Sequence, residues 1–385
     1  MIEYITSGQS HGKGMFITIK GLPSNLPVSE ETLNAELARR QRGYGRGGRQ
    51  KIESDRAEIL AGVYRGRTIG APVTLAIWNK DWENWKNAQP PAVVQPRPGH
   101  ADLSGAYKYD MRDDVRKVLE RSSARETSAR VAGGAICKSL LSEFGVEIMH
   151  TVVNWGGIEI PLPEGMSYRE MGEISESNDL RCVADGPTSD KIREMVDQAA
   201  ADGNTVGGTV MVAVSPMIPL LGSYVTWERK LDARIAQAVL SVQAMKGIEF
   251  GLGFGYADTH GRDAHDEIFY DREAGRFYRE TNRAGGIEGG MSNGEAIVFR
   301  AAVKPIPTLM TPLRTVNLET FEPESASRER SDVTAVSAAG VILESVTAFV
   351  LADALLERYG GDSLEQIKHA VENDPALSSF RWKRS

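Results

Sequence analysis

Cysteine is scarce in this sequence: Cys137 and Cys182 are the only two among 385 residues. They lie far apart in the chain and belong to no C-x-x-C pair or Cys/His cluster, which is the spacing that zinc sites require. We therefore expect neither disulfide bonds nor a bound metal ion.

The sequence also lacks a long uninterrupted apolar run. Its most apolar stretch, residues 338–356, contains Glu344 and Asp353, whereas a membrane-spanning helix needs about 20 almost uninterrupted apolar residues. Residues 1–14 contain no basic segment followed by an apolar one, as a secretory signal would. We expect a cytoplasmic protein that does not enter a membrane.

Positive charge is in deficit overall but concentrated locally. The 45 Lys and Arg residues are outnumbered by 52 Asp and Glu residues, and the formal net charge of −7 argues against a general nucleic-acid-binding protein. Five arginines nevertheless fall in one short stretch, namely Arg39, Arg40, Arg42, Arg46 and Arg49. A cationic site in an acidic protein suits a small polyanionic ligand better than a polymer.

No Pro/Ser-rich or highly charged linker divides the chain, and 41% of its residues are hydrophobic. We therefore expect one large domain over residues 1–385, with a tail that is flexible from about residue 375. Alternating apolar patterns predict strands at residues 15–20, 72–77, 209–214 and 297–303. Helical patterns lie between them, which indicates an α+β fold.

The first two predicted helices have recognisable ends. One begins at Ser29 and ends before Gly43, so that Arg39, Arg40 and Arg42 are delivered to a loop. Another begins at Ser123, which forms a capping-box pattern with Glu126, and runs to Gly145. Its first half is rich in Ala and Gly, which predicts close packing against a neighbour.

A third helix is predicted over residues 332–359. It is apolar almost all round, which indicates burial in the centre of the fold. Asp332 is its expected N-cap, and a capping carboxylate can also be catalytic if its second oxygen faces a cavity.

The two halves of the chain contain similar short segments. GQSHG (residues 8–12) and GNTVG (203–207) both precede a predicted strand, while ERSS (120–123) and ERSD (329–332) both open a predicted helix. Each pair is separated by about half of the chain. An internal duplication with a pseudo-two-fold arrangement and a chance match of glycine-containing segments both stay open as explanations.

Two of the six histidines occupy turns that glycine or proline makes rigid. His11 lies in GQSHG, where the backbone can approach a ligand closely. His100 lies in RPGHAD (residues 97–102), where proline and glycine stiffen the turn. Histidine titrates near neutral pH, so both are candidate catalytic residues; the alternative for each is an ordinary exposed turn.

Two further segments are suited to binding an anion. GYGRGGR (residues 43–49) is an RNA-binding segment, a flexible anion clamp or a solvated loop, and its single short copy between predicted elements favours the clamp. RSS (residues 121–123) offers a guanidinium, hydroxyls and backbone N–H groups to a phosphate or an electron-rich ring. The alternative for the second segment is a helix cap alone.

KPIPT (residues 304–308) follows a predicted strand, and its two prolines fix an extended turn that can hold a ligand against Lys304 and Thr308. GGIEGG (residues 285–290) forms a tight loop upstream. Taken alone, both segments indicate only ordinary turns or loops.

Together these segments resemble the chorismate synthase family over nearly the whole chain. The resemblance is carried, in order, by GQSHG (8–12), RRQRGYGRG (39–47), RPGHAD (97–102), RSSARET (121–127), GGIEGG (285–290), KPIPT (304–308) and RSD (330–332). The RSD and KPIPT forms are similar to those of the Gram-positive branch of the family.

The resemblance implies helices sandwiched between antiparallel sheets and assembly as a homotetramer. It implies reduced FMN bound at Arg121, Ser122, Ser123, Gln243, Ala244, Gly289, Lys304, Pro305, Ile306, Pro307, Thr308 and Arg330. It also implies that substrate, or NADPH as a candidate reductant, is held by Arg40, Arg46, Arg49 and Arg125.

The implied reaction is a lyase reaction of aromatic amino-acid biosynthesis by the shikimate pathway. Phosphate is removed from 5-enolpyruvylshikimate 3-phosphate by a 1,4-anti elimination, with reduced FMN lending electron density and no net redox change. By resemblance, His11 assists the departing phosphate, His100 stabilises the anionic flavin, and Asp332 accepts, through the flavin N5, the proton taken from the substrate.

One position departs from the family pattern: Gln9 replaces the glutamate usual in the first motif. Glutamine preserves a hydrogen bond but removes a charge beside His11, so we expect weaker electrostatic support for an imidazolium there. Two other functions remain as alternatives, an RNA-binding protein that uses its Arg/Gly segment and an NADPH-dependent flavin reductase.

Overall fold

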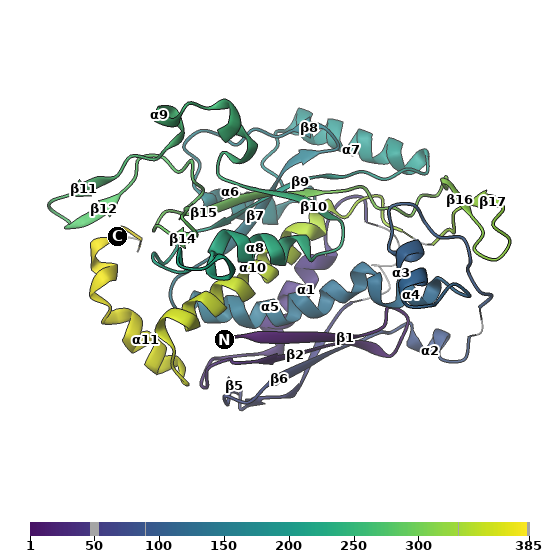
Figure 1. The fold of residues 1–385 in the computed structure, drawn as a ribbon, viewed down its shortest axis with the longest axis horizontal. Helices are drawn as coiled ribbons and strands as arrows, with labels where there is room; N and C mark the ends of the chain where they lie inside the picture. The colour runs from purple at the N-terminus through teal and green to yellow at the C-terminus, as the bar shows by residue number, and fades with distance from the viewer. Residues whose placement is uncertain (47–53, 89, 330, 383–385) are drawn as a thin grey trace.

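Two antiparallel sheets face each other across a layer of helices in the computed structural model, which describes residues 1–46, 54–88, 90–329 and 331–382 (Figure 1). The first sheet has the strand order β1-β2-β6-β3 and the second β10-β15-β9-β7-β8. The strands are β1 Glu3–Gly8, β2 Gly14–Lys20, β3 Ala57–Ala61, β6 Val73–Trp78, β7 Ile148–Trp155, β8 Ile158–Glu159, β9 Gly208–Val214, β10 Met245–Phe250 and β15 Ile297–Val303. The four predicted strands are confirmed as β2, β6, β9 and β15.

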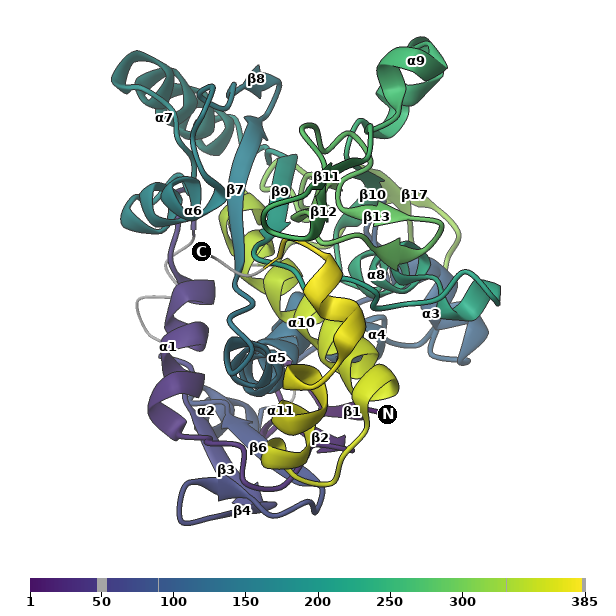
Figure 2. The same ribbon diagram turned by 90° about the vertical axis from the view of Figure 1, so that its left-hand side faces the viewer.

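Three helices fill the space between the sheets. α5 (Thr127–Ser142) packs on β2 and β6, α10 (Val336–Tyr359) packs on β7 and β9, and α1 (Glu30–Gln41) packs against both helices (Figure 2). The alternation in β2 directs Ile17 and Ile19 inward, where both are fully buried. Mixed helix and strand content in one chain agrees with the predicted α+β class.

Shorter elements surround these layers. The helices are α2 Trp82–Trp85, α3 Asp102–Lys108, α4 Arg116–Ser122, α6 Tyr168–Ser177, α7 Gly186–Ala201, α8 Leu231–Leu240, α9 Gly261–Ala264 and α11 Leu364–Glu372. Single 3₁₀ turns are η2 Ala124–Glu126, η3 Trp227–Arg229, η4 Gly253–Asp258 and η5 Pro375–Ser379. Two-stranded ribbons are β4 Val63–Tyr64 with β5 Arg67–Thr68, β11 Phe269–Asp271 with β12 Arg276–Tyr278, β13 Ile287–Glu288 with β14 Met291–Ser292, and β16 Arg314–Val316 with β17 Pro323–Ser325.

The predicted close packing of the Ala/Gly-rich helix is confirmed where α5 crosses α10. A Cβ atom added at Gly134 would lie 2.5 Å from Cβ and 2.8 Å from the carbonyl oxygen of Ser345. α10 is long and apolar enough to cross a membrane, but 89% of its most apolar window is buried inside the fold. It is therefore a core helix, as its all-round apolar surface predicted.

The predicted first helix is confirmed at its start and revised at its end. Ser29 caps α1 by accepting a hydrogen bond from the backbone N–H of Thr32. Arg39 and Arg40 stay in the last helical turn instead of entering a loop, and only Arg42 follows the helix. Arg39 and Arg40 both point inward. The guanidinium of Arg39 bonds the buried Glu344 of α10, and that of Arg40 bonds Thr127 at the start of α5.

The capping box expected at Ser123 does not form. Ser123 does accept a hydrogen bond from the N–H of Arg125, but the turn that it caps is η2, and α5 begins only at Thr127. The Glu126 carboxylate cannot return to Ser123, because it accepts hydrogen bonds from Thr6 Oγ1 at 2.7 Å and from Arg130 Nε at 3.0 Å.

The prediction that Asp332 caps the third helix is wrong, because α10 begins four residues later, at Val336. The intervening residues are bound as extended chain. The Val333 N–H donates to Gly45 O, and Val333 O accepts from the Val206 N–H, each at 2.9 Å. These bonds prevent a helical turn at Asp332. Its side chain instead lies beside Arg46, in the segment that follows α1.

The C-terminal tail, for which we expect flexibility from about residue 375, is anchored as far as the structure describes it. Residues 375–379 form η5, and Leu377 and Trp382 are buried. The Arg381 N–H donates to Phe277 O at 3.1 Å, which ties the tail to β12.

A buried carboxylate joins the elements of the helical layer. Glu344, in the middle of α10, is fully buried and accepts hydrogen bonds from Arg39 of α1 at 2.7 and 3.0 Å, from Lys138 of α5 at 2.6 Å and from His150 of β7 at 2.6 Å. Burial acts to raise the pKa of Glu344, but its interactions with Arg39, Lys138 and His150 outweigh it and hold this pKa well below the usual value.

Replacement of Glu344 by alanine is expected to destabilise the fold by about 3–5 kcal/mol, because it leaves buried cations without their counter-charge. Chemical denaturation measures the change. The control is Glu3→Ala, which removes a surface ion pair with Lys20 and should change stability by less than about 1 kcal/mol. Equal losses in the two variants would contradict a structural role for Glu344.

The same carboxylate gives stability a pH dependence. Its pKa is depressed in the folded state, so its contribution is present above the unfolded value of 4.5 and is lost as the pH falls through the folded value.

Candidate active site

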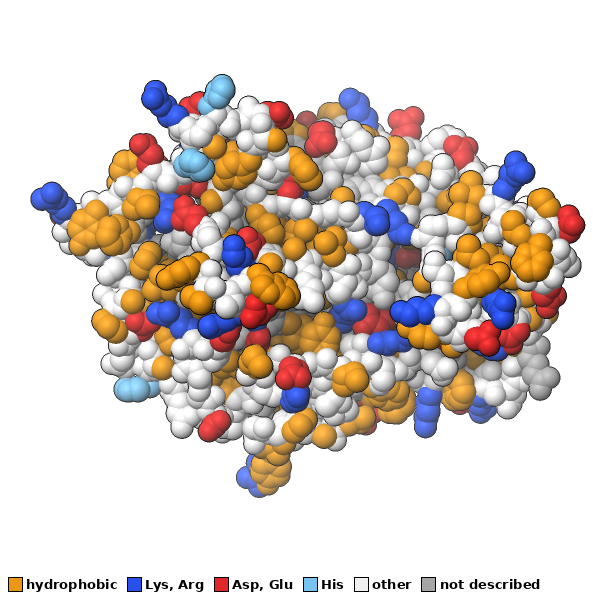
Figure 3. All heavy atoms as spheres, in the orientation of Figure 1, with side chains coloured by type: hydrophobic (Ala, Val, Ile, Leu, Met, Phe, Trp, Pro, Cys, Tyr) orange, Lys and Arg blue, Asp and Glu red, His pale blue; other side chains and the backbone are white. Residues whose placement is uncertain are grey.

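Several of the predicted site residues lie on or around one segment, residues 120–127, which runs from the end of α4 through η2 into α5. Its backbone and side chains contact the β1–β2 turn, the last turn of α1 and the strand β1. Figure 3 shows Lys and Arg side chains gathered on the part of the surface that α3 and α4 form, beside a hollow.

His11 lies in the β1–β2 turn and is held by Glu120. Glu120 Oε2 accepts from the His11 backbone N–H at 2.8 Å, and Oε1 lies 2.7 Å from His11 Nδ1. Trp85 of α2 lies against the imidazole, with 4.4 Å between ring centroids. Burial acts to raise the pKa of Glu120, but the hydrogen bonds from His11 outweigh it and lower this pKa. The negative charge that Gln9 does not supply is thus present on Glu120.

Asn79, directly after β6, holds the turn that carries His11. Its Nδ2 donates to the carbonyl oxygens of Gln9, Ser10 and Gly12 at 3.2, 3.2 and 2.7 Å. Its Oδ1 accepts from Arg125 Nε and Nη2 at 3.0 and 2.9 Å. Asn79 therefore connects the turn to a buried arginine.

Arg40 and Arg125 share one buried carboxylate, Asp55. Asp55 Oδ1 accepts from Arg125 Nη1 at 2.5 Å, and Oδ2 from Arg40 Nη1 at 3.4 Å. Arg40 also donates to Thr127 Oγ1 at 2.9 and 3.0 Å. Burial lowers the pKa of Arg40 to about 10 despite the charge of Asp55, so the guanidinium stays cationic at neutral pH.

Arg46 pairs with Asp332, with 3.2 Å between Nη1 and Oδ2. Arg46 Nε is buried and has no hydrogen-bond partner among the described residues. Arg40 interacts electrostatically with both members of this pair. Among the described residues, three guanidinium groups therefore lie with two carboxylates, a balance of charge that suits a polyanion.

His100 and the KPIPT turn form a second group. The His100 Nδ1 lies 2.5 Å from Oδ1 of fully buried Asp102, whose other oxygen accepts from Arg97 Nε at 2.8 Å. Burial acts to raise the pKa of Asp102, but the hydrogen bonds from His100 and Arg97 outweigh it and lower this pKa. Arg97 Nη1 also donates to Thr308 Oγ1 at 3.0 Å.

The backbone completes this group. Gly99, with φ of +77°, takes the left-handed conformation that glycine adopts readily, and its carbonyl oxygen accepts from Lys304 Nζ. The Lys304 N–H donates to Ala244 O at 2.9 Å. Pro307 lies beside Gly99, and Ile306 O accepts from Thr205 Oγ1 at 2.8 Å. Pro305 precedes Ile306 in the same turn.

Gln243 connects the two groups through Glu126. Gln243 Nε2 donates to Glu126 Oε2 at 3.4 Å, while its Oε1 is buried without a hydrogen-bond partner among the described residues. Thr6 donates to Glu126 Oε1, and Arg121 Nη2 donates to Thr6 Oγ1 at 2.7 Å. Arg121 is half exposed.

The remaining predicted residues make other contacts or lie elsewhere. Ser122 Oγ donates to Val118 O within α4, and Ser123 Oγ accepts from Ser10 Oγ at 3.2 Å. Gly289 is exposed and lies in the turn next to the start of α8, whereas Gln243 follows the end of that helix, about 15 Å along its axis. Arg49 and Arg330 lie outside the described residues.

The sequence patterns do not single out the residues that hold the candidates in place, which are Asp55, Asn79, Asp102, Glu120 and Thr127. Glu120, Asp102 and Thr127 stood inside or beside segments that had been singled out. Asp55 and Asn79 follow no local pattern, because their contacts are to residues far away in the sequence.

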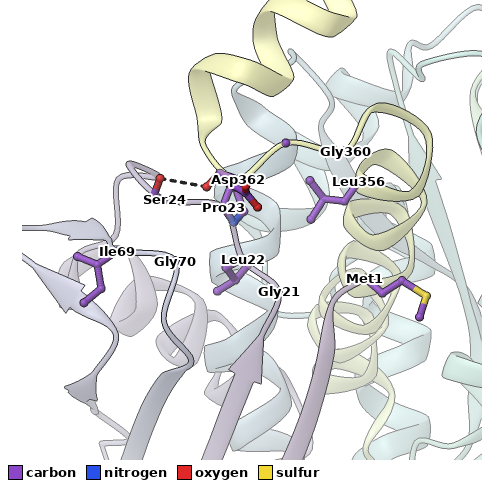
Figure 4. Close-up of a pocket in the computed structure, with 11 residues that line it drawn as sticks. Met1, Gly21, Leu22, Pro23, Ser24, Ile69, Gly70, Leu356, Gly360 and Asp362 are labelled. Carbon is purple, nitrogen blue, oxygen red and sulfur yellow. Dashed lines mark hydrogen bonds between the residues drawn. The ribbon is translucent and has the colours of Figure 1, made fainter.

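A separate pocket of about 600 Å³ lies between the end of β2 and the end of α10 (Figure 4). It is lined by Met1, Gly21, Leu22, Pro23, Ser24, Ile69, Gly70, Leu356, Gly360, Gly361 and Asp362. The lining contains no Arg, Lys or His side chain, and Asp362 would repel an anion. This pocket does not suit a phosphorylated dicarboxylate.

The chain was compared with known proteins. The model of the family described as chorismate synthase matches residues 2–356. The chain belongs to the chorismate synthase family. Members of this family are lyases of the shikimate pathway that act on 5-enolpyruvylshikimate 3-phosphate and use a reduced flavin.

Relatives named chorismate synthase match over nearly full length. The protein from Geobacter sulfurreducens is 50% identical, with 97% of this chain and 98% of the relative covered. The protein from Enterococcus faecalis, a Gram-positive bacterium, is 50% identical, with 96% and 98% covered. A solved structure titled "Crystal Structure of Chorismate Synthase" is 40% identical with a TM-score of 0.81, covering 98% of this chain and 99% of that one. The resemblance proposed from the motifs is confirmed.

Asp332 caps no helix. Its replacement can therefore change turnover without changing the stability of the fold. Asp332→Asn keeps the shape of the side chain and a hydrogen-bond acceptor for Arg46, so the melting temperature should change little. Turnover should fall by about 10²-fold or more if the carboxylate accepts a proton. Asp185→Ala is the control, since Asp185 is the N-cap of α7 and should affect melting without affecting turnover. Normal turnover in Asp332→Asn would remove this residue from the chemistry.

Arg46→Ala is expected to raise the KM for substrate by about 10- to 100-fold, the size of one hydrogen bond to a charged group, while the protein stays folded. Arg42→Ala is the control. The Arg42 side chain is 64% exposed and its Nη1 lies 3.6 Å from Glu176 Oε1, so its removal should leave KM nearly unchanged. Steady-state kinetics and thermal melting of both variants decide the matter. An unfolded Arg46→Ala protein would instead show that the loop is structural.

Proposed function

We propose that this chain converts 5-enolpyruvylshikimate 3-phosphate to chorismate and phosphate, with reduced FMN bound and no net redox change. The observation that carries the proposal is a connected set of charged groups. Arg40 interacts with the Arg46–Asp332 pair and shares Asp55 with Arg125, and Asn79 links Arg125 to the turn that carries His11. The substrate carries a phosphate and two carboxylates, and guanidinium groups bind such anions through paired, charge-assisted hydrogen bonds. Arg49 belongs to the same proposed substrate-binding set.

Burial makes these arginines effective. A guanidinium shielded from water interacts more strongly with an anion than an exposed one does. Asp55 and Asn79 fix the orientation of Arg125, so little side-chain freedom is lost when substrate binds. As phosphate departs, the same cations offset the charge that develops on it.

The two histidines are proposed to have different roles. His11 protonates or hydrogen-bonds the departing phosphate, since it lies beside the arginine group. His100, next to the Lys304–Thr308 turn, contributes a hydrogen bond to the negatively charged cofactor ring. Asp332 is the proposed acceptor, at its carboxylate, of the proton removed from the substrate. Its pairing with Arg46 keeps that carboxylate among the substrate-binding cations.

The residues around Gln243 suit a flavin. Gln243 Oε1 is an acceptor left buried without a partner among the described residues, and a ring N–H of the flavin would satisfy it. Arg121, Ser122, Ser123, Ala244, Gly289, Lys304, Pro305, Ile306, Pro307, Thr308 and Arg330 complete the proposed set. Bound reduced FMN supplies electron density that makes loss of an allylic phosphate feasible.

NADPH is a candidate reductant of the flavin, with Arg40 and Arg46 as residues that suit its phosphates. We further propose a cytoplasmic homotetramer with an internal pseudo-two-fold duplication. The duplication is supported by one of its two pairs of segments, because residues 8–12 precede β2 and residues 203–207 precede β9. The second pair, which we expect to open two helices, gives no such support, because residues 120–122 end α4 and Asp332 lies four residues before α10.

The deciding experiment is an anaerobic assay with FMN, substrate and either dithionite or NADPH. We expect phosphate and chorismate to form over many turnovers while the flavin stays reduced, with no stoichiometric NADPH consumption. Accumulation of oxidised flavin that depends on substrate would contradict the mechanism. NADPH oxidation without phosphate release would favour a flavin reductase, and RNA binding that weakens with salt, in a colourless protein, would favour the RNA-binding alternative.

A further inference from the structure

The Glu120 carboxylate bonds two groups of His11, its backbone N–H and its ring Nδ1. The carboxylate accepts the backbone N–H through Oε2 at 2.8 Å and approaches the ring Nδ1 through Oε1 at 2.7 Å. The Ser10 N–H also donates to the backbone oxygen of Glu120 at 2.9 Å. Both residues are largely buried, with 14% of the His11 and 19% of the Glu120 side chain exposed. The position and the ring orientation of His11 are therefore both set by Glu120.

We propose that Glu120 is a positioning residue that keeps the proton on His11 Nδ1 and thereby assigns proton transfer to Nε2. The proposal rests on the proposed function, in which His11 assists the departure of phosphate. An ionised carboxylate only accepts hydrogen bonds, so Nδ1 must be the donor in this contact. Nε2 is then the ring nitrogen left to face the substrate.

The charges around Glu120 support this assignment. Besides His11, the cation acting on Glu120 is Arg116 of α4. Asp102, the carboxylate paired with His100, is instead bound by Arg97 through three hydrogen bonds, at 2.8, 3.1 and 3.1 Å. Asp102 thus accepts most of its hydrogen bonds from Arg97 rather than from His100. The carboxylate of Glu120, by contrast, accepts hydrogen bonds from His11. Both side-chain hydrogen bonds that Glu120 makes among the described residues therefore go to His11.

Trp85 restricts the same ring from its face. Its ring centroid lies 4.4 Å from that of His11, with 42° between the planes, and its Nε1 is tied to Asp81 Oδ2 at 2.9 Å. The face of an aromatic ring also favours a neighbouring cation. With Glu120 in the ring plane and Trp85 on the face, the imidazole is held against rotation.

The proton inventory is simple. Before the reaction the imidazolium carries protons on Nδ1 and Nε2. The C–O bond to phosphate breaks, its electron pair stays on phosphate, and the Nε2 proton moves to a phosphate oxygen. On the carbon side, the electron pair of the C–H bond that is lost becomes part of the new double bond, and the proton from that bond goes to the Asp332 carboxylate. The Nδ1 proton stays in its hydrogen bond with Glu120, and the ring is left neutral with Nε2 unprotonated.

The first test uses the unmodified protein labelled with ¹⁵N-histidine. His11→Asn identifies the His11 signals by their loss. Across a pH titration we expect Nδ1 to keep its proton and Nε2 to be the nitrogen that loses one. A neutral ring protonated on Nε2 overturns the proposal, whatever any variant does.

The second test is a double-mutant cycle with Glu120→Gln and His11→Asn, assayed with reduced FMN and substrate. Glu120→Gln should lower kcat by at least about tenfold, with KM nearly unchanged, and should shift the ring of His11 toward the Nε2-protonated tautomer. In the His11→Asn background the same substitution should change kcat by less than about twofold, because it acts through His11. Additive losses would overturn the proposal.

Glu143→Gln is the matched control. Glu143 pairs with Lys368 at 2.6 Å and follows the far end of α5, so kcat and the tautomer should both stay as in the unmodified protein. If the unmodified protein formed no chorismate, the proposed function would fail. Activity combined with a normal Glu120→Gln variant would reject the role of Glu120 alone.

Discussion

The buried carboxylate of Glu344 is the contact on which the arrangement of the helices depends. It binds side chains from α1, α5 and β7 at one point inside α10. Such a charge is tolerated in a protein interior only when its partners match it closely. Arg39 is one of those partners, so the neighbouring Arg40, about 100° further round α1, points to another side of the helix, where the proposed substrate site lies. Stability and recognition thus share one helical turn.

Regular features of this fold could be predicted from the sequence because they depend on local patterns. Alternation identified β2, β6, β9 and β15, and a cap residue followed by acids identified the start of α1. Helix boundaries that tertiary contacts decide were predicted wrongly. Asp332 has the residue type of an N-cap, but hydrogen bonds from Val333 to the distant Gly45 and Val206 keep its segment extended. No local pattern contains that information.

The candidate site shows the same division. Its histidines and arginines were identified because their segments are unusual, and the family resemblance ordered them. The residues that orient them were overlooked, because an ordinary Asp55 or Asn79 gains its role only when β3, β6 and η2 come together. Glu120 illustrates the point best: the charge missing at Gln9, two positions before His11, is provided from more than a hundred residues away.

Arg40 and Arg125 are each less than 10% exposed. Because of this burial, the rate of substrate binding and the rate of substrate release should respond differently to added salt. Mobile ions cannot reach these guanidinium groups, so added salt weakens their contacts with a bound substrate only slightly. The chain as a whole carries a formal net charge of −7, and a negative field of this kind repels an approaching anion at low ionic strength. Moderate salt should therefore speed capture while leaving retention almost intact, which is opposite to the behaviour of enzymes that attract anions with exposed lysines.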